Sequence, residues 1–180
     1  WGLARTAVEL LGAGETERAG ALVAMLRAGA RSADEHDAPT LRAIVDWLDA
    51  ATALYAGTPG PLLERARAIA DTFEATGYVR HSALVALHAA IAAVAVGDAA
   101  GGISWAERAA ELARRLGLRS HELRARAWLA LHLARTGLDE LALATAEAAL
   151  GGAGGDRVVE AEARVHLAIL RASAGDLEAA

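Results

Sequence analysis

Long apolar stretches rich in Ala and Leu alternate along the chain with short segments of Gly, Pro and charged residues. Ala and Leu are strong helix formers, whereas the Val, Ile and aromatic residues that favour strands are sparse. The pattern therefore predicts an all-α fold. The expected helices span 3–13, 16–29, 39–56, 60–76, 78–96, 103–117, 120–136, 139–150 and 157–174.

A glycine that precedes the second helix of a pair recurs at a nearly constant interval. Successive spacings are 43, 40, 40 and 38 residues, and a period of this size indicates repeated helical hairpins. The series consists of Gly14, Gly57, Gly97, Gly137 and Gly175. It divides a single repeat domain, 1–180, into units of about 1–30, 31–77, 78–118, 119–155 and 156–180.

The last residues of the chain resemble the start of a helix. Gly175 can close one helix, and Asp176 can cap the next because its carboxylate accepts first-turn amides. The chain also begins with Trp1 rather than Met. We therefore expect it to be a piece of a longer protein that stops inside the fifth unit, after one helix.

Local signals agree with these hairpins. Ser104 and Glu107 fit a capping box, which predicts a helix start near residue 103. Prolines in first turns and glycines after second helices mark other boundaries: Pro39, Pro59, Pro61, Gly77 and Gly117. An alanine seven positions before each turn glycine would let paired helices approach closely: Ala7, Ala50, Ala90, Ala130 and Ala168.

Composition narrows the class of protein. With 54% hydrophobic and 23% charged residues, the chain can bury enough apolar surface to fold. It has no Cys, which excludes disulfides and thiolate metal sites and leaves a reducing cytosol as the default compartment. The net charge of −5 argues against a general phosphate-binding surface. The apolar run 82–96 is too short to span a membrane and is better explained as a buried helix.

Motifs for catalysis or cofactor binding are missing from the sequence. It has no GxxxxGK[ST], GxGxxG, HExxH or GxSxG pattern, and the glycine-rich segment 151–156 follows a helix and lacks Lys, so we interpret it as a connector. His81 and His88 are two helical turns apart, too far to share one metal ion. We therefore expect neither an enzyme nor a cofactor or metal site.

Two charged segments have structural explanations. The acidic loop from Asp34 to Asp37 lacks the six or more fixed oxygens that a hard cation needs, so a solvated capping loop is the expected role. The basic stretch 108–126 places Arg114 and Arg115 at a helix C-terminus, where a cation offsets the helix dipole. We expect no direct nucleic-acid contact and no membrane contact.

Two segments carry a resemblance to a known repeat family. GDLEAA at 175–180 and GLDELALATAEAAL at 137–150 resemble the turn and second helix of tetratricopeptide repeats. The chain departs from that family in its longer period and in four positions where the family has aromatic residues: Ala93, Arg126, Arg164 and Arg171. The resemblance implies a right-handed superhelical α-solenoid of antiparallel hairpins.

The longer units narrow this resemblance. Residues 106–150 look like the C-terminal sensor arrays of MalT-like, LuxR-type or AfsR-type bacterial ATP-dependent transcription regulators. The resemblance implies a cytoplasmic domain that binds a protein, a peptide, a neighbouring domain of its parent chain or a small-molecule inducer.

If the first helices line the concave side of the array, as the resemblance implies, they offer an apolar groove with two arginines. Such a groove could bind an amphipathic helix, a peptide carboxylate or an amphiphilic small molecule. Packing between repeats would explain the same apolar residues. The candidates are Trp47, Leu54, Tyr55, Leu84, Leu87, Ile91, Arg124, Leu131 and Arg135.

Two other functions remain open. The helices 39–56, 78–96 and 120–136 could enclose an enzymatic or small-ligand pocket, in which His81, His88 or His132 would meet Asp46 or Asp49. The segment 157–180 could instead dock on a second copy and make the chain a self-associating scaffold.

Overall fold

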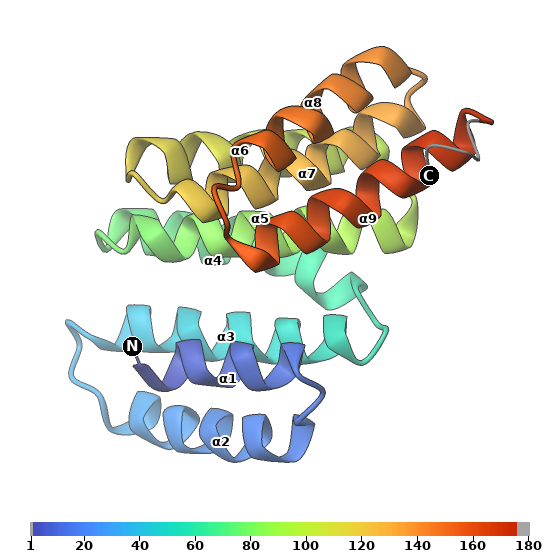
Figure 1. Cartoon of the computed structure of the whole chain (residues 1–180). Coiled ribbons are helices and arrows are strands. Elements are labelled where there is room, and N and C mark those ends of the chain that lie inside the picture. The colour runs from blue at the N-terminus through green and yellow to red at the C-terminus, as the bar shows by residue number, and fades with distance from the viewer. Residues whose placement is uncertain (1, 176–180) are drawn as a thin grey trace. The chain divides into compact units, whose positions relative to one another are not determined.

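A computed structural model of the chain describes residues 2–175, and these residues form helices and turns without any strand (Figure 1). The predicted all-α class is confirmed. The expected helix start after Gly175 lies outside the described residues. The helices are α1 (Gly2–Gly12), α2 (Thr16–Ser32), α3 (Ala38–Tyr55), α4 (Gly60–Ala75), α5 (Val79–Val96), α6 (Ala99–Arg115), α7 (Arg119–Arg135), α8 (Asp139–Gly151) and α9 (Arg157–Ser173).

The predicted start of α6 is wrong by four residues. Ser104 lies inside the helix, and the N-cap is Asp98, whose Oδ1 accepts a hydrogen bond from the amide of Gly101 at 2.9 Å. This carboxylate satisfies a first-turn donor, so the helix begins at Ala99 despite two poor helix formers, Gly101 and Gly102, in its first turns. The predicted capping box at Ser104 and Glu107 is therefore wrong.

Glycines with positive φ end most of the helices. At the end of α5, Gly97 has φ of 75°, and the next amide, that of Asp98, donates to the carbonyl of Ala93 at 3.0 Å. This bond caps the carbonyl groups of the last turn, and the left-handed backbone it needs favours Gly. The turn glycines of the sequence series share this backbone, as do Gly77 and Gly117: Gly14, Gly57, Gly97, Gly137 and Gly175.

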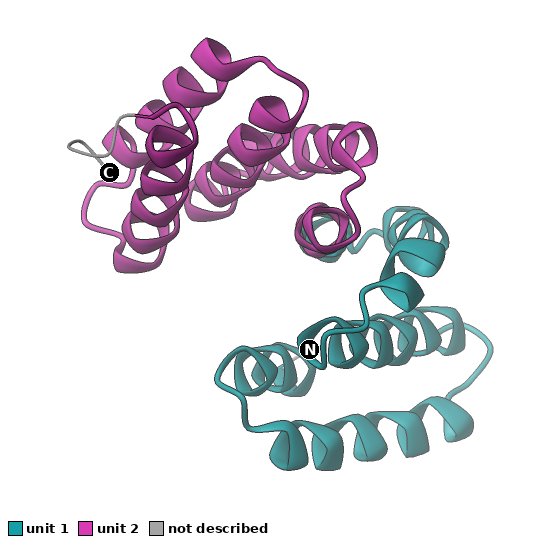
Figure 2. Cartoon of the chain, turned by 90° about the vertical axis from the view of Figure 1, so that its right-hand side faces the viewer, with its two compact units in different colours: residues 1–85 teal, residues 86–180 magenta. Residues whose placement is uncertain are grey.

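The chain divides into two compact units, residues 1–85 and 86–180, coloured separately in Figure 2. In the first unit, α2 contacts α1 and α3, α1 contacts α3, and α3 contacts α4. In the second unit, α7 contacts α6, α8 and α9, and α8 contacts α9. Each unit thus combines neighbouring antiparallel helices with a contact between alternate helices, which is a repeat-like arrangement.

The alanines seven positions before the turn glycines lie deep in these contacts. Ala7, Ala50, Ala90 and Ala130 are fully buried, and Ala168 is half-buried. The burial of four of the five alanines agrees with a place between packed helices, where a small side chain allows close approach.

Among the described helices, α5 is the one long and apolar enough to cross a membrane, with a mean hydropathy of 1.7, because the helix adds residues 79–81 to the run 82–96 that the sequence predicts to be too short. Inside the protein, 56% of this segment is buried. The buried core helix of a soluble protein can be equally long and apolar.

Candidate functional site

Trp47 lies in the core of the first unit. The residue is 1% exposed, and its ring meets the rings of Phe73 and His81 edge to face, with centroids 6.2 Å and 6.1 Å away. At the end of the same helix, Leu54 is half-buried and Tyr55 is exposed. Of these three groove candidates, Tyr55 therefore offers the most surface to a ligand, whereas Trp47 packs α3 against the core.

His81 belongs to this aromatic cluster. Its ring centroid is 5.5 Å from that of Phe73 and 6.1 Å from that of Tyr78. Burial, with a smaller contribution from the positive charge of Arg80, lowers the pKa of His81 to about 4. The imidazole is therefore neutral at physiological pH and packs as an aromatic ring.

The apolar groove candidates of α5 and α7 are all at least partly covered. Leu87 is buried in a cluster with Ala86, Ala109 and Ala125, and Ile91 packs against the edge of that cluster. Leu84 is half-buried. Leu131 is half-buried against a second cluster in α7, α8 and α9. Leu84, Ile91 and Leu131 therefore remain partly accessible, whereas Leu87 is buried.

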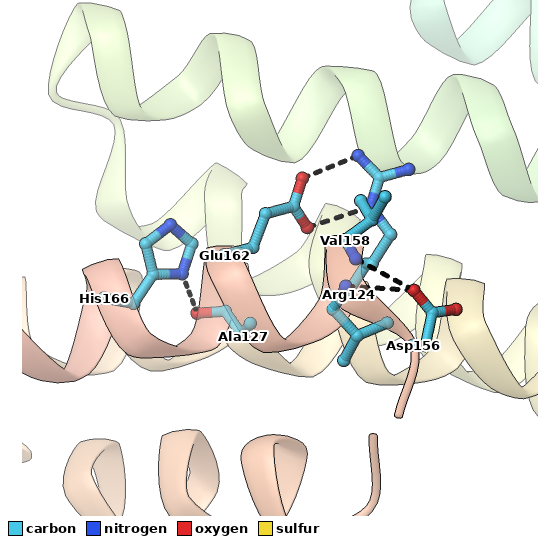
Figure 3. A network of polar contacts seen from close by, with 7 residues as sticks. Arg124, Ala127, Asp156, Val158, Glu162 and His166 are labelled. Atoms are coloured by element: carbon cyan, nitrogen blue, oxygen red, sulfur yellow. Dashed lines mark hydrogen bonds and ion pairs between the residues drawn. The ribbon is translucent and has the colours of Figure 1, made fainter. Parts of the chain in front are cut away.

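Arg124, one of the two arginines of the predicted groove, pairs with a carboxylate on a different helix. Its Nε and Nη2 donate to both carboxylate oxygens of Glu162 at 2.8 Å and 2.7 Å, which joins α7 to α9 (Figure 3). Both side chains are largely buried, at 28% and 22% exposed. The Arg124 guanidinium thus already holds a carboxylate in the place where a ligand was expected.

The start of α9 is fixed next to this ion pair. The carboxylate of Asp156 accepts hydrogen bonds from the amides of Val158 and Val159 and from the hydroxyl of Ser120 on α7. The hydrogen bond from Ser120, followed by those from the two amides, lowers the pKa of Asp156. The glycine-rich segment before it is a connector between α8 and α9, as predicted.

His166 makes a third link between α7 and α9. Its Nδ1 lies 2.9 Å from the carbonyl oxygen of Ala127, which can only accept, so Nδ1 carries the hydrogen. The ring also meets Trp128 edge to face at 4.5 Å between centroids. Burial lowers the pKa of His166 and favours the neutral ring.

His132 links α7 to α5 in the same manner. Its Nε2 donates to the carbonyl oxygen of Ala90 at 2.9 Å, and its fully buried ring lies against Gly102 of α6. Nearby, Nη1 of Arg135 donates to the carbonyl oxygen of Val94 at 2.7 Å. Burial lowers the pKa of His132. Polar side chains of α7 and α9 thus reach the backbone of the preceding odd-numbered helix.

Several arginines of the basic stretch 108–126 pair with carboxylates of the same stretch or with a nearby aromatic ring. Arg114 pairs with Glu111, and the buried carboxylate of Glu122 lies between Arg119 and Arg126 on α7. The guanidinium of Arg108 lies 5.7 Å from the ring centre of Trp105. These contacts agree with the structural role predicted for the stretch.

The acidic loop forms a local turn. Oδ1 of Asp34 accepts hydrogen bonds from the amides of His36 and Asp37, and the Asp34 carbonyl accepts one from Ala38 at the start of α3. Across residues 2–175, no three His, Asp or Glu side chains are grouped as metal ligands would be.

Comparisons with protein-family models, with curated proteins and with solved structures give no match.

Proposed function

We propose that this chain is a non-catalytic helical-repeat domain that binds a protein segment or a small ligand. The observation that carries the proposal is the repeated link between odd-numbered helices: His132 joins α7 to α5, and His166 of α9 and Arg124 of α7 both join α7 to α9. Side chains that bridge one hairpin to the next stabilise an array of repeats, the architecture that tandem helical hairpins use to present extended binding surfaces.

The histidines support a structural rather than a catalytic role. A general base needs a pKa near the working pH and access to its substrate. His132 and His166 are buried and donate to backbone carbonyls, while His81 and His88 have pKa values lowered to about 4 by burial. Their chemistry suits packing better than proton transfer.

In this proposal the array is a right-handed solenoid whose odd-numbered helices line the binding surface. Among the groove candidates of the first unit, Tyr55 is the most exposed, with 43% of its surface accessible. The half-buried edges of Leu54 and Leu84 would add to the surface of the first unit, and the half-buried candidates of the second unit are Ile91 and Leu131. Binding would favour one arrangement of the repeats over another and so change contacts with neighbouring domains.

The domain would belong to a larger cytoplasmic bacterial transcription regulator of the MalT-like, LuxR-type or AfsR-type group. Sequencing the gene on both sides of these codons tests that context. We expect a P-loop ATPase segment upstream and a helix-turn-helix downstream. An enzyme or membrane domain in their place would contradict the regulator assignment.

Binding itself is testable on the chain alone. We would pan a displayed peptide library on the immobilised protein and measure the selected peptides by fluorescence anisotropy. Tyr55→Ala should weaken binding at least tenfold and leave the melting temperature within a few degrees, because the ring is exposed. Tyr78→Phe, which removes only the hydroxyl of a half-buried tyrosine, is the control and should leave binding unchanged. A library without any specific binder would contradict the proposal.

A further inference from the structure

A cleft of about 480 Å³ lies between α2 and α3 of the first unit. One face of α2 contributes Arg27 and Arg31, which are one helical turn apart. One face of α3 contributes Arg42 and Asp46 at the same spacing. Ala38 and Val45 of α3 form an apolar floor beneath these charges, and both are buried.

One of the three arginines is already neutralised. Nη2 of Arg27 contacts both carboxylate oxygens of Asp49, at 2.6 Å and 2.7 Å. This ion pair fixes the Arg27 side chain against α3. The Arg27 side chain is therefore a wall of the cleft rather than a free binding group.

The remaining charges of the cleft have no such partner. Within residues 2–175, Arg31 and Asp46 make no ion pair, and both are exposed. Nε of Arg42 donates to the carbonyl oxygen of Ala38 at 3.1 Å, which orients the guanidinium while leaving its two terminal nitrogens as donors. The cleft thus offers two cationic forks and one carboxylate acceptor.

A neighbouring cleft of about 680 Å³ between α3 and α4 does not change the excess of positive over negative charge. It shares Arg42 and Asp46 with the first cleft and adds one charge of each sign, Glu64 and Arg65. The excess positive charge therefore belongs to the α2 side.

From these charges we infer that the α2–α3 cleft binds a small α-amino dicarboxylic acid, of which glutamate is the simplest probe. Two carboxylates match the guanidinium groups of Arg31 and Arg42, each of which can bind a carboxylate through two parallel N–H bonds. The ammonium group matches Asp46, and the aliphatic carbons rest on Ala38 and Val45. The inference rests on the proposed function and names a ligand class for its sensing role.

Glutamate binding is tested on the ¹⁵N-labelled full chain by NMR titration at low salt, because exposed charges are screened by salt. We expect saturable shifts confined to amides around residues 27–46. Arg31→Ala combined with Arg42→Ala should weaken glutamate binding at least tenfold. Arg157→Ala, which removes one exposed arginine from α9, should not change it.

Ligand and variant pairs separate the contributions of the groups. Glutarate, which lacks the ammonium group, should bind at least fivefold more weakly than glutamate to the wild type. Asp46→Asn should reduce glutamate binding and leave glutarate binding unchanged or stronger.

Three results would overturn the inference: no saturable shift, equal affinity of wild type and double variant, or equal affinity for glutamate and glutarate. If glutamate fails while a selected peptide still binds through Tyr55, the cleft inference falls and the repeat-domain proposal stands. If both fail, both are wrong.

Discussion

The ring of His132 occupies the space that a side chain on Gly102 would need. A Cβ built on Gly102 would lie between 2.0 Å and 2.4 Å from three ring atoms, which is far inside any normal contact. The absence of a side chain at this position therefore lets α6 lie against the histidine that bonds to α5. The two residues form one packing unit although they are 30 positions apart.

Gly102→Ala should lower the free energy of unfolding by about 1–3 kcal/mol, because the new methyl group overpacks the His132 ring. Urea unfolding measures the change. Gly20→Ala in α2 is the control: no atom lies within 4 Å of its added Cβ, so it should raise stability by about 0.5–1 kcal/mol. A Gly102→Ala protein as stable as the wild type would refute the close contact.

At the scale of the helix, one carboxylate fixes the start of α9. Asp156→Ala removes the acceptor for two first-turn amides and for the hydroxyl of Ser120, so we expect a loss of about 1–2 kcal/mol. Asp156→Asn, which keeps an oxygen acceptor, should retain most of that stability. Chemical denaturation of the three proteins would show the order, and equal stability of the Ala variant and wild type would rule out the cap.

The ion pair between α7 and α9 makes a separate contribution. A double-mutant cycle of Arg124→Met and Glu162→Gln should give a coupling energy of about 1 kcal/mol, because the pair is bidentate and largely shielded from solvent. The exposed i,i+4 pair of Arg5 and Glu9 provides the comparison, with a coupling of about 0.3–0.5 kcal/mol. Equal coupling energies for the two pairs would mean that partial burial does not strengthen the ion pair.

Helix positions were largely predictable from the sequence because their ends are set locally. A glycine after the last turn or a proline in the first turn acts within a few residues, and α4, α8 and α9 begin where the sequence predicts. The exception, α6, has two glycines in its first turn that helix propensity disfavours, and Gly102 is needed there because the ring of a histidine from the next helix packs against it. Such a reason is invisible in local sequence.

The role of individual side chains was less predictable for the same reason. The spacing of Arg124 and Trp47 placed them on a helical face, but the sequence does not tell whether a carboxylate from α9 or a ring from α4 already occupies that face. The partners of His132 and His166 are backbone carbonyls, which carry no residue-specific signal. The alternating helix contacts were predictable, whereas the groups that fill them were not.

At the scale of the whole chain, buried histidines predict a loss of stability in mild acid. The pKa of His88 is lowered to about 4 by burial, with smaller contributions from Arg124 and His121, and the pKa values of His81, His132 and His166 are also lowered. In the unfolded chain the histidines bind protons near pH 6.5, while His81 and His88 stay neutral in the folded chain until about pH 4. Stability should therefore be constant above about pH 7.5 and fall between pH 6.5 and 4.

His88 alone should account for about 3 kcal/mol of this loss once the pH is below 4. Urea unfolding at pH 7.5, 6 and 5 would measure the slope. His88→Leu should flatten the slope, because it removes a buried neutral imidazole. Stability that rises as the pH falls from 7 to 5 would contradict the buried neutral rings.

The regular spacing of the helix-ending glycines restricts how the chain can change in length. From Gly57 to Gly137, a positive-φ glycine occurs every 20 residues. An insertion of one residue inside a helix would turn every later side chain of that helix by about 100°, so His132 or His166 would face away from its carbonyl. Duplicating or deleting a whole block of about 40 residues keeps every face in register. Evolution or engineering should therefore alter the length of this protein in steps of a complete hairpin.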